Sequence, residues 1–318
     1  MINTIKVASL QMKSLNNDIE ANINKATTLI KQAVKKDAKL ILLPEFAITG
    51  YELNENIWSL AETINGKTIT WLKKISKQYG IWLGTSFLEV DGENFYNTFV
   101  LTNPNGEEDG RVYKEVPGSV ETYLFKGRES NHIIDTDFGK VGVIICYDGI
   151  KYEPLQKLSQ QEPDIILLPH SAAQPSTIPI LFPKRAIDFL DNYTKNVASR
   201  ISKLFGVPSI MANKTGKWKS DMPKPYPSQN GKFLGYSTIT DGKGKVLKQS
   251  DCKEDILICE VLLDKNLKRK DINIENYSGF STKVTWHFKW WFLVENKGKK
   301  FYDNSQIRIE TANIIDGR

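Results

Sequence analysis

One cysteine stands where a buried strand is predicted to end. The run Gly-Val-Ile-Ile at 142–145 leads into Cys146, and Asp148 and Gly149 follow as turn-forming residues. Short apolar runs bounded by turn residues are typical of fully buried strands, and ligands in α/β folds gather at the carboxyl ends of such strands. Cys146 is therefore a candidate nucleophile, although a free cysteine taken alone is more often an inert packing residue.

Two charged residues also follow predicted strands. Glu45 comes after Leu-Ile-Leu-Leu-Pro at 40–44, and Lys114 comes after Arg-Val-Tyr at 111–113. A thiol with an ordinary pKa of about 8.5 is mostly protonated at neutral pH, so attack on an amide needs an adjacent base. Glu45 could supply the base, while Lys114 and the backbone N–H of Tyr147 could stabilise an oxyanion. Each charge alone would be interpreted as solvated, but the three strand ends together indicate nucleophilic catalysis.

The elements that must position these residues alternate between strand and helix. Helical spacing of apolar residues predicts helices over 18–35, 69–79, 153–159 and 184–204. Strands are predicted over 5–12, 40–46, 81–87, 95–101, 142–146, 164–168, 207–213, 233–239, 245–247 and 256–262. Mixed strands and helices in this order, with hairpin turns among the crossovers, predict one α/β domain filling residues 1–264.

Residues 265–318 are predicted to form a C-terminal extension. Five large aromatic residues lie within 284–294, a stretch too short to span a bilayer. Exposed apolar patches usually mark interfaces, so we expect a packing or subunit-contact segment, with a membrane-surface segment as the alternative. The five aromatic residues are Trp286, Phe288, Trp290, Trp291 and Phe292.

Composition and charge exclude several classes of protein. The chain of 318 residues is 40% hydrophobic and 25% charged, which is ordinary for a globular protein. Most of the net charge of +6 comes from 265–318, which contains eleven Lys and Arg and six Asp and Glu. The main body is therefore close to neutral and shows no excess of basic residues of the kind that binds nucleic acid. Three cysteines without a CxxC pair argue against a disulfide framework, and with only three histidines they make a metal site improbable. The N-terminus carries no signal-peptide pattern, so we expect a cytoplasmic protein. We also expect that the protein needs no cofactor.

The order of these motifs resembles the nitrilase superfamily of carbon–nitrogen hydrolases, over nearly all of 1–264. The pieces that carry the resemblance are Val-Ala-Ser-Leu-Gln at 7–11, Leu-Pro-Glu-Phe at 43–46, Tyr-Lys at 113–114, Cys-Tyr-Asp at 146–148, Pro-Asp-Ile-Ile-Leu-Leu-Pro at 163–169 and Gly-Tyr-Ser-Thr-Ile at 235–239. The resemblance implies a four-layer α-β-β-α sandwich, a triad of Glu45, Lys114 and Cys146, and a thioester intermediate. It also makes Glu121 the candidate second glutamate, which would orient Lys114 or handle the hydrolytic water.

The resemblance further implies a small-molecule substrate and a homodimer or larger homo-oligomer. Tyr147-Asp148 after the nucleophile is similar to the amidase and carbamoylase branches, which favours an amide or carbamoyl compound over a nitrile. Two other readings stay open. His170 follows a predicted strand and could serve Cys146 as base in a thiol hydrolase or transferase, or the domain could be a non-catalytic scaffold that binds a partner through its extension.

Overall fold

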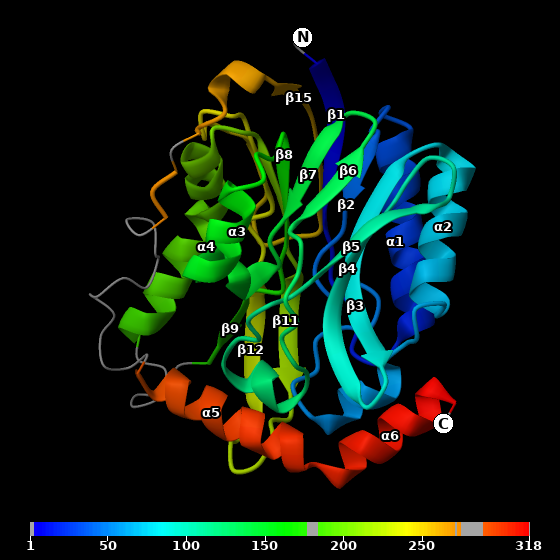
Figure 1. Ribbon diagram of the computed structural model, residues 1–318, viewed down its shortest axis with the longest axis vertical. Helices are drawn as coiled ribbons and strands as arrows, with labels where there is room; N and C mark the ends of the chain where they lie inside the picture. The colour runs from blue at the N-terminus through cyan, green and yellow to red at the C-terminus, as the bar shows by residue number, and fades with distance from the viewer. Residues whose placement is uncertain (1–2, 177–183, 271, 275–288, 318) are drawn as a thin grey trace.

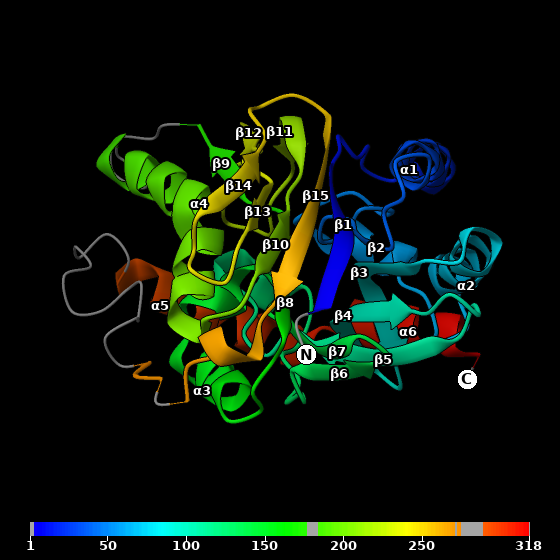
Figure 2. The ribbon, with the colours of Figure 1, turned by 90° about the horizontal axis from the view of Figure 1, so that it is seen from above.

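Two six-stranded β-sheets lie face to face in the computed structural model, which describes residues 3–176, 184–270, 272–274 and 289–317 (Figures 1 and 2). In spatial order the first sheet contains β15 (Asp255–Leu263), β1 (Asn3–Gln11), β2 (Leu40–Leu42), β3 (Trp82–Asp91), β4 (Asn94–Thr102) and β5 (Glu108–Tyr113). The second contains β14 (Val246–Gln249), β13 (Thr238–Thr240), β10 (Ser209–Ala212), β8 (Ile165–Pro169), β7 (Gly139–Val143) and β6 (Ile133–Thr136).

The main core fills the space between the two sheets. Val7 and Leu42 of the first sheet share one buried cluster with Val143 and Ile210 of the second. Successive strand residues point to opposite faces, so one set of apolar residues meets the facing sheet and the other set meets the helices outside. Strands with two buried faces explain the nearly continuous apolar runs in the sequence.

Amphipathic helices cover the outer face of each sheet. α1 (Ile19–Val34) and α2 (Lys67–Tyr79) lie against the first sheet, and α3 (Tyr152–Ser159) and α4 (Lys184–Phe205) lie against the second (Figure 2). Asp18 caps α1 by accepting a hydrogen bond from the backbone of Ala21, and Gly80 ends α2 in the left-handed conformation. The protein is therefore a four-layer α-β-β-α sandwich, as predicted.

Shorter elements complete the fold near one end of the sandwich. A small sheet contains β11 (Thr215–Ser220), β12 (Gln229–Leu234) and β9 (Ala173–Pro175), and four 3-10 helices are described, η1 (Glu55–Leu60), η2 (Ser119–Tyr123), η3 (Cys146–Ile150) and η4 (Lys265–Leu267). Two of these 3-10 helices, η2 and η3, carry predicted site residues. They follow β5 and β7 respectively, so both begin near the ends of strands in facing sheets.

Several predicted strands differ in their bounds from the observed ones. β2 ends at Leu42, because Pro44 cannot donate to the ladder and Phe46 has a φ of 49°. β7 ends at Val143, and Cys146 opens a helical turn instead of ending a strand. The predicted strand 233–239 is broken at Gly235 and Tyr236, whose φ values of 74° and 60° turn the chain from the small sheet into the second large sheet.

The described part of the extension folds back on the sandwich. α5 (Lys289–Asn304) and α6 (Gln306–Asp316) run across one end of both sheets (Figure 1). Val294 and Tyr302 are buried in one cluster with Trp58 and Phe95, and the Tyr302 hydroxyl oxygen accepts a hydrogen bond from the backbone N–H of Phe95 at 2.8 Å. The division of the chain at Asp264 and a subunit contact through the extension stay predictions.

The side chains of four of the five aromatic residues that motivated the subunit-contact prediction lie outside the described part of the structure. Trp286 and Phe288 lie outside the described residues, as do the side chains of Trp290 and Trp291. Phe292 is 60% exposed. Within the described ranges, no helix is both long enough and apolar enough to cross a membrane.

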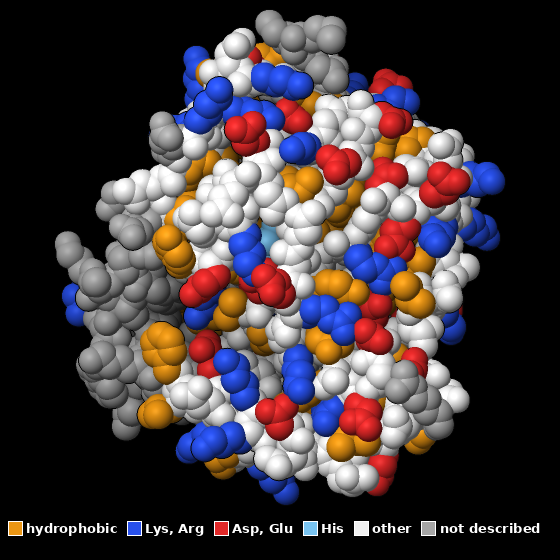
Figure 3. Space-filling view, viewed as in Figure 1, with side chains coloured by type: hydrophobic (Ala, Val, Ile, Leu, Met, Phe, Trp, Pro, Cys, Tyr) orange, Lys and Arg blue, Asp and Glu red, His pale blue; other side chains and the backbone are white. Residues whose placement is uncertain are grey.

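Charges of both signs are interspersed over the face shown in Figure 3. Lys and Arg side chains are mixed there with Asp and Glu side chains. The ion pairs on the exterior of the protein include Arg128 with Asp91. Exposed pairs of this kind contribute little to stability. This face therefore presents no broad basic patch of the type that binds a nucleic-acid backbone.

Candidate active site

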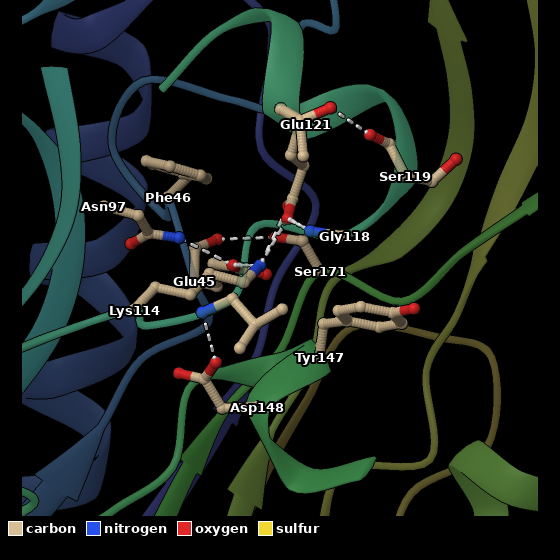
Figure 4. Close-up of polar contacts among 12 residues, drawn as sticks. Glu45, Phe46, Asn97, Lys114, Gly118, Ser119, Glu121, Tyr147, Asp148 and Ser171 are labelled. Carbon is tan, nitrogen blue, oxygen red and sulfur yellow. Dashed lines mark hydrogen bonds and ion pairs between the residues drawn. The ribbon is translucent and has the colours of Figure 1, made fainter. Parts of the chain in front are cut away.

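Three ionisable side chains from different loops meet at the strand ends (Figure 4). Lys114 follows β5, and its Nζ lies 2.8 Å from Oε1 of Glu45 and 2.7 Å from Oε2 of Glu121. All three residues are at most 3% exposed. Burial alone would lower the pKa of Lys114, but the negative charges of Glu121 and Glu45 raise it well above its ordinary value. Lys114 therefore stays an ammonium group in a buried site.

The two oxygens of Glu45 have different surroundings. Oε1 accepts hydrogen bonds from Lys114 Nζ and, at 2.7 Å, from the side-chain amide of Asn97. Oε2 is buried and has no hydrogen-bond partner among the described residues. Since a buried acceptor without a partner is costly, this oxygen is open to a hydrogen bond from a group placed in the site.

The backbone around Glu45 is fixed from several directions. Its carbonyl accepts a hydrogen bond from Ser171 Oγ at 2.7 Å, and the carbonyl of Phe46 accepts one from Lys214 Nζ at 2.8 Å. Lys214 is fully buried, which lowers its pKa well below the ordinary value. Phe46 has a positive φ, a conformation that costs free energy outside glycine unless the surroundings hold it. These bonds thus fix the turn from which the Glu45 carboxylate projects.

Cys146 stands at the first residue of η3 with a φ of 46°. The side chain is half-buried and belongs to the cavity wall that also contains Lys114 and Glu121. Burial and then the negative charge of Glu45 raise the pKa of the Cys146 thiol well above its ordinary value, while Lys114 opposes them. The resting thiol is therefore protonated at neutral pH and needs a base before it can attack.

Glu121 on η2 is saturated with hydrogen bonds. Oε1 accepts from Lys114 Nζ at 2.9 Å and from the Tyr51 hydroxyl at 2.8 Å. Oε2 accepts from Lys114 Nζ at 2.7 Å and from the backbone N–H of Gly118 at 2.6 Å. Three donor groups thus make four hydrogen bonds to this carboxylate, which suits it to orienting Lys114.

Tyr147, the residue after the candidate nucleophile, is tied to the extension. Its hydroxyl donates to Oε1 of Glu295 on α5 at 3.1 Å, and the same oxygen accepts from the backbone N–H of Ser119 at 3.3 Å. Glu295 is 8% exposed. One carboxylate from α5 thus contacts both η3, which carries Cys146, and η2, which carries Glu121.

Asp148 lies within a turn, η3, as its neighbouring glycine had suggested, but its side chain does not cap that turn. Its buried carboxylate instead accepts hydrogen bonds from the backbone N–H groups of Glu115 and Val116, at 3.1 Å and 2.9 Å. Burial raises the pKa of Asp148 to about 7. The physical reason for the difference is that the chain after Lys114 passes directly beside η3, and its donors would otherwise be unsatisfied. Glu115 itself points away from the site and pairs with Lys157 at 2.9 Å.

His170 lines the same cavity as Cys146 but is a weak base. Its Nδ1 lies 3.1 Å from the carbonyl oxygen of Leu168, which can only accept, so Nδ1 carries the proton. Burial lowers the pKa of His170 to about 4, which makes it neutral at pH 7. Nε2 has no hydrogen-bond partner within the described part of the chain.

The sequence reasoning missed four residues that support the site, namely Asn97, Lys214, Tyr51 and Glu295. Two of them carried a signal that could have been used. Asn97 is a polar residue inside the apolar run 95–101, and Lys214 follows a predicted strand as Glu45 and Lys114 do. Tyr51 and Glu295 carried no such signal, because their contacts join segments far apart in the chain. No cluster of His, Cys, Asp and Glu suited to a metal ion occurs among the described residues.

Comparison with known proteins identifies the family of the chain. Residues 6–265 match the family model for carbon-nitrogen hydrolases. A nitrilase from Pyrococcus abyssi is 29% identical over 276 residues, covering 85% of this chain and 95% of the relative. N-carbamoylputrescine amidase from Arabidopsis thaliana is 26% identical over 273 residues, covering 82% and 87%.

A solved structure shares the fold. It is a mutant of the amidase from Nesterenkonia sp. AN1 with the acetamide moiety of fluoroacetamide added covalently at the active site cysteine, and it is similar with a TM-score of 0.68 at 18% identity, covering 87% of this chain and 96% of that one. The family model spans most of the sequence and the fold agrees with it. The chain therefore belongs to the carbon-nitrogen hydrolase family of the nitrilase superfamily and is a hydrolase of non-peptide carbon–nitrogen bonds.

Proposed function

We propose that Glu45, Lys114 and Cys146 form a catalytic triad that hydrolyses an amide or carbamoyl compound through a thioester. The observation that carries this proposal is the different bonding of the two Glu45 oxygens. Oε1 accepts hydrogen bonds from two donors, and Oε2 has no donor within the described residues. Beside a thiol that is protonated at rest, a buried carboxylate with one unpartnered oxygen is a suitable general base.

The first half of the reaction forms the thioester. Oε2 of Glu45 takes the thiol proton while Sγ of Cys146 bonds to the carbonyl carbon of the substrate. The negative charge that develops on the carbonyl oxygen is stabilised by the Lys114 ammonium and by the backbone N–H of Tyr147. When the carbon–nitrogen bond breaks, Glu45 returns its proton to the leaving nitrogen. Ammonia or an amine departs, and the acyl group remains on Cys146.

The second half releases the acid. Glu45 removes a proton from a water molecule, which attacks the thioester carbonyl and forms a second oxyanion at the same donors. The carbon–sulfur bond then breaks, and the thiolate recovers the proton from Glu45. Glu121 acts by holding Lys114, because all of its bonds described above are already made. Of the two roles predicted for Glu121, the bonding supports orientation.

The Cys–His alternative receives less support from the site. Taking the thiol proton would give His170 a positive charge in a buried site that already holds the Lys114 ammonium, and burial and Lys114 both lower the pKa of His170, to about 4. The solved amidase with an adduct at its active site cysteine supports a cysteine nucleophile in this fold. The scaffold alternative would be favoured by loss of a triad residue, and all three residues are present.

Nitrile hydrolysis is the second candidate function, and the name of the Pyrococcus abyssi relative favours it. The pair Tyr147-Asp148 and the name of the Arabidopsis relative favour an amide or carbamoyl compound. An amide develops its negative charge on oxygen and needs donors at once, whereas a linear nitrile develops charge on nitrogen and needs a proton from another direction. The deciding assay compares a primary amide with its matching nitrile while following ammonia and carboxylate. Faster turnover of the nitrile across several acyl groups would exclude the amide proposal.

The nucleophile is tested separately by trapping the acyl group. With a slow amide substrate, mass spectrometry of the intact enzyme and its peptides is expected to place an acyl adduct on the peptide that contains Cys146. Cys146→Ala should lose turnover and adduct together and keep its fold, because the substitution removes one sulfur atom and leaves a small cavity. An adduct on Cys252 or Cys259 would contradict the assignment.

A further inference from the structure

The cavity beside Cys146 has an apolar wall. Leu53, Val120, Ile150, Leu190, Met222 and Leu234 line it. These residues come from six separate segments, including η2, η3, α4 and β12. The apolar character of the cavity wall therefore does not depend on a single loop. A wall of this composition removes apolar surface of a ligand from water, which is favourable.

The aromatic residues of the wall turn their polar atoms toward the protein. The Tyr193 hydroxyl donates to the carbonyl of Gly149 at 3.2 Å, and the Trp218 indole N–H donates to the carbonyl of Tyr51 at 2.9 Å. The Tyr51 hydroxyl donates to Glu121, as described above. A ligand in the cavity therefore meets mainly the rings of these residues.

The charged groups in the wall are already paired. Among the described lining residues, the only ones with a formal charge are Lys114 and Glu121, which bind each other at 2.7 Å. An additional Lys or Arg that could pair with a substrate carboxylate is absent from that set, and so is an additional Asp or Glu for a substrate ammonium. A charge placed there would lose its hydration without gaining a counter-ion, which is strongly unfavourable.

We propose that the group attached to the reacting carbonyl is uncharged and apolar, as in an aliphatic or aromatic monocarboxamide or the matching alkylurea. The proposal rests on the function proposed above and specifies the substrate class of the same site. It excludes amides whose far end carries a carboxylate or an ammonium group. Selectivity then comes from desolvation, because a charged end would be buried without a partner while a methyl end would not.

The test uses three amides of equal length. Hexanamide ends in a methyl group, 5-aminopentanamide ends in an ammonium group, and glutaramate ends in a carboxylate. We expect kcat/KM for hexanamide to exceed that for each charged amide by at least about tenfold. Lengthening the series from propanamide to hexanamide should raise kcat/KM by about fourfold per methylene until the cavity is filled. Equal or faster turnover of either charged amide would overturn the proposal.

Binding to an inactive variant separates this proposal from the proposed mechanism. Calorimetry with Cys146→Ala should detect hexanamide and find both charged amides at least about tenfold weaker. If hexanamide binds to the variant and the wild-type enzyme does not hydrolyse it, the proposed function fails and the apolar site stands. If a charged amide binds as tightly as hexanamide, or if none of the three binds, the apolar site is refuted.

A substitution in the wall tests the same idea by gain of function. Met222→Arg adds a cation to the cavity and should raise the ratio of kcat/KM for glutaramate to that for hexanamide by at least about tenfold. Ile314→Arg is the matched control, because Ile314 is 80% exposed on α6 and lies outside the cavity wall. The ratio should stay unchanged in the control, and an unchanged ratio in a folded Met222→Arg protein would count against the proposal.

Discussion

Asn97 holds Glu45 and Lys114 together. Its side-chain amide donates to Oε1 of Glu45 at 2.7 Å, and its backbone carbonyl accepts the N–H of Lys114 at 2.9 Å. The amide occupies one carboxylate oxygen and leaves the other for proton transfer. One buried residue of β4 therefore sets both the position of the candidate base and the point at which the candidate oxyanion-stabilising lysine leaves its strand.

Asn97→Ala is expected to lower kcat/KM by about 10- to 100-fold, since a hydrogen bond to a charged group contributes about 1.5–3 kcal/mol. KM should change little, because Asn97 is outside the cavity wall. Asn97→Asp should be worse than Asn97→Ala, because it places a second carboxylate against Glu45 in a buried site. Steady-state kinetics of both variants provide the measurement. Wild-type kcat in Asn97→Ala would show that the contact is dispensable.

Glu45→Gln and Lys114→Ala are expected to lower kcat and kcat/KM together, by about 100-fold or more, because both residues act on the transition state. His170→Ala should retain most of its activity. The three variants are compared at pH 7 with the same amide substrate. An inactive His170→Ala together with an active Glu45→Gln would establish the cysteine–histidine mechanism instead.

Lys214→Met tests whether the turn at Phe46 positions the base. The substitution keeps the length of the side chain and removes the donor to the Phe46 carbonyl. We expect kcat to fall by about tenfold with little change in KM, because a shifted turn misplaces Glu45 without altering the cavity wall. Lys217→Met is the matched control, because Lys217 lies close to Lys214 in the chain and its side chain is exposed on β11. Equal kinetic effects in both variants would argue against a positioning role.

The buried His170 predicts a pH dependence of stability. Burial lowers the pKa of this side chain from 6.5 to about 4 in the folded protein, so between these values the unfolded chain binds one more proton than the folded chain. The contribution of His170 is fully present above pH 6.5 and is lost as the pH falls toward 4, at about 1.4 kcal/mol per pH unit. Denaturant unfolding should therefore show a smaller acid-side loss in His170→Gln than in the wild type. Parallel curves for the two proteins would contradict the assignment of a lowered pKa.

Phe292 and Leu293 are adjacent on α5 and are 60% and 64% exposed. Two exposed apolar side chains side by side are consistent with the predicted subunit contact through the extension. The double variant Phe292→Ser, Leu293→Ser is expected to shift the mass in light scattering from an oligomer toward the monomer. Ile307→Ser is a control, because Ile307 is equally exposed at 64% on α6. An unchanged mass in the double variant would place the contact elsewhere.

Truncation after Asp264 tests the extension as a whole. The cut removes buried Val294 and Tyr302 together with the bonds from Glu295 to Tyr147 and Ser119. We expect an insoluble protein or one of altered mass, since the cluster around Trp58 would be exposed. A truncated protein with unchanged mass, solubility and activity would refute the predicted role of 265–318.

The sequence by itself predicted the α/β fold class and the candidate site residues. Apolar runs of strand length and helices with one apolar face are local patterns, and together they predicted one α/β domain. Glu45, Lys114 and Cys146 were found in the same way, because each follows such a run. The four-layer arrangement was implied by the resemblance to the nitrilase superfamily. The boundaries were less accurate where a single residue decided them, as Pro44 does for β2 and Tyr236 for the broken strand.

Tertiary structure decided which groups surround the candidate triad. Asn97 reaches Glu45 because β4 lies two strands from β2 in the sheet, and Lys214 reaches Phe46 from a segment 168 residues away. Glu295 reaches the site from α5 and accepts a hydrogen bond from Tyr147. The Asp148 carboxylate accepts hydrogen bonds from the backbone after Lys114 instead of capping η3. No local period encodes such contacts. They depend on strand order and on which buried donors and acceptors remain to be satisfied once the sheets have packed.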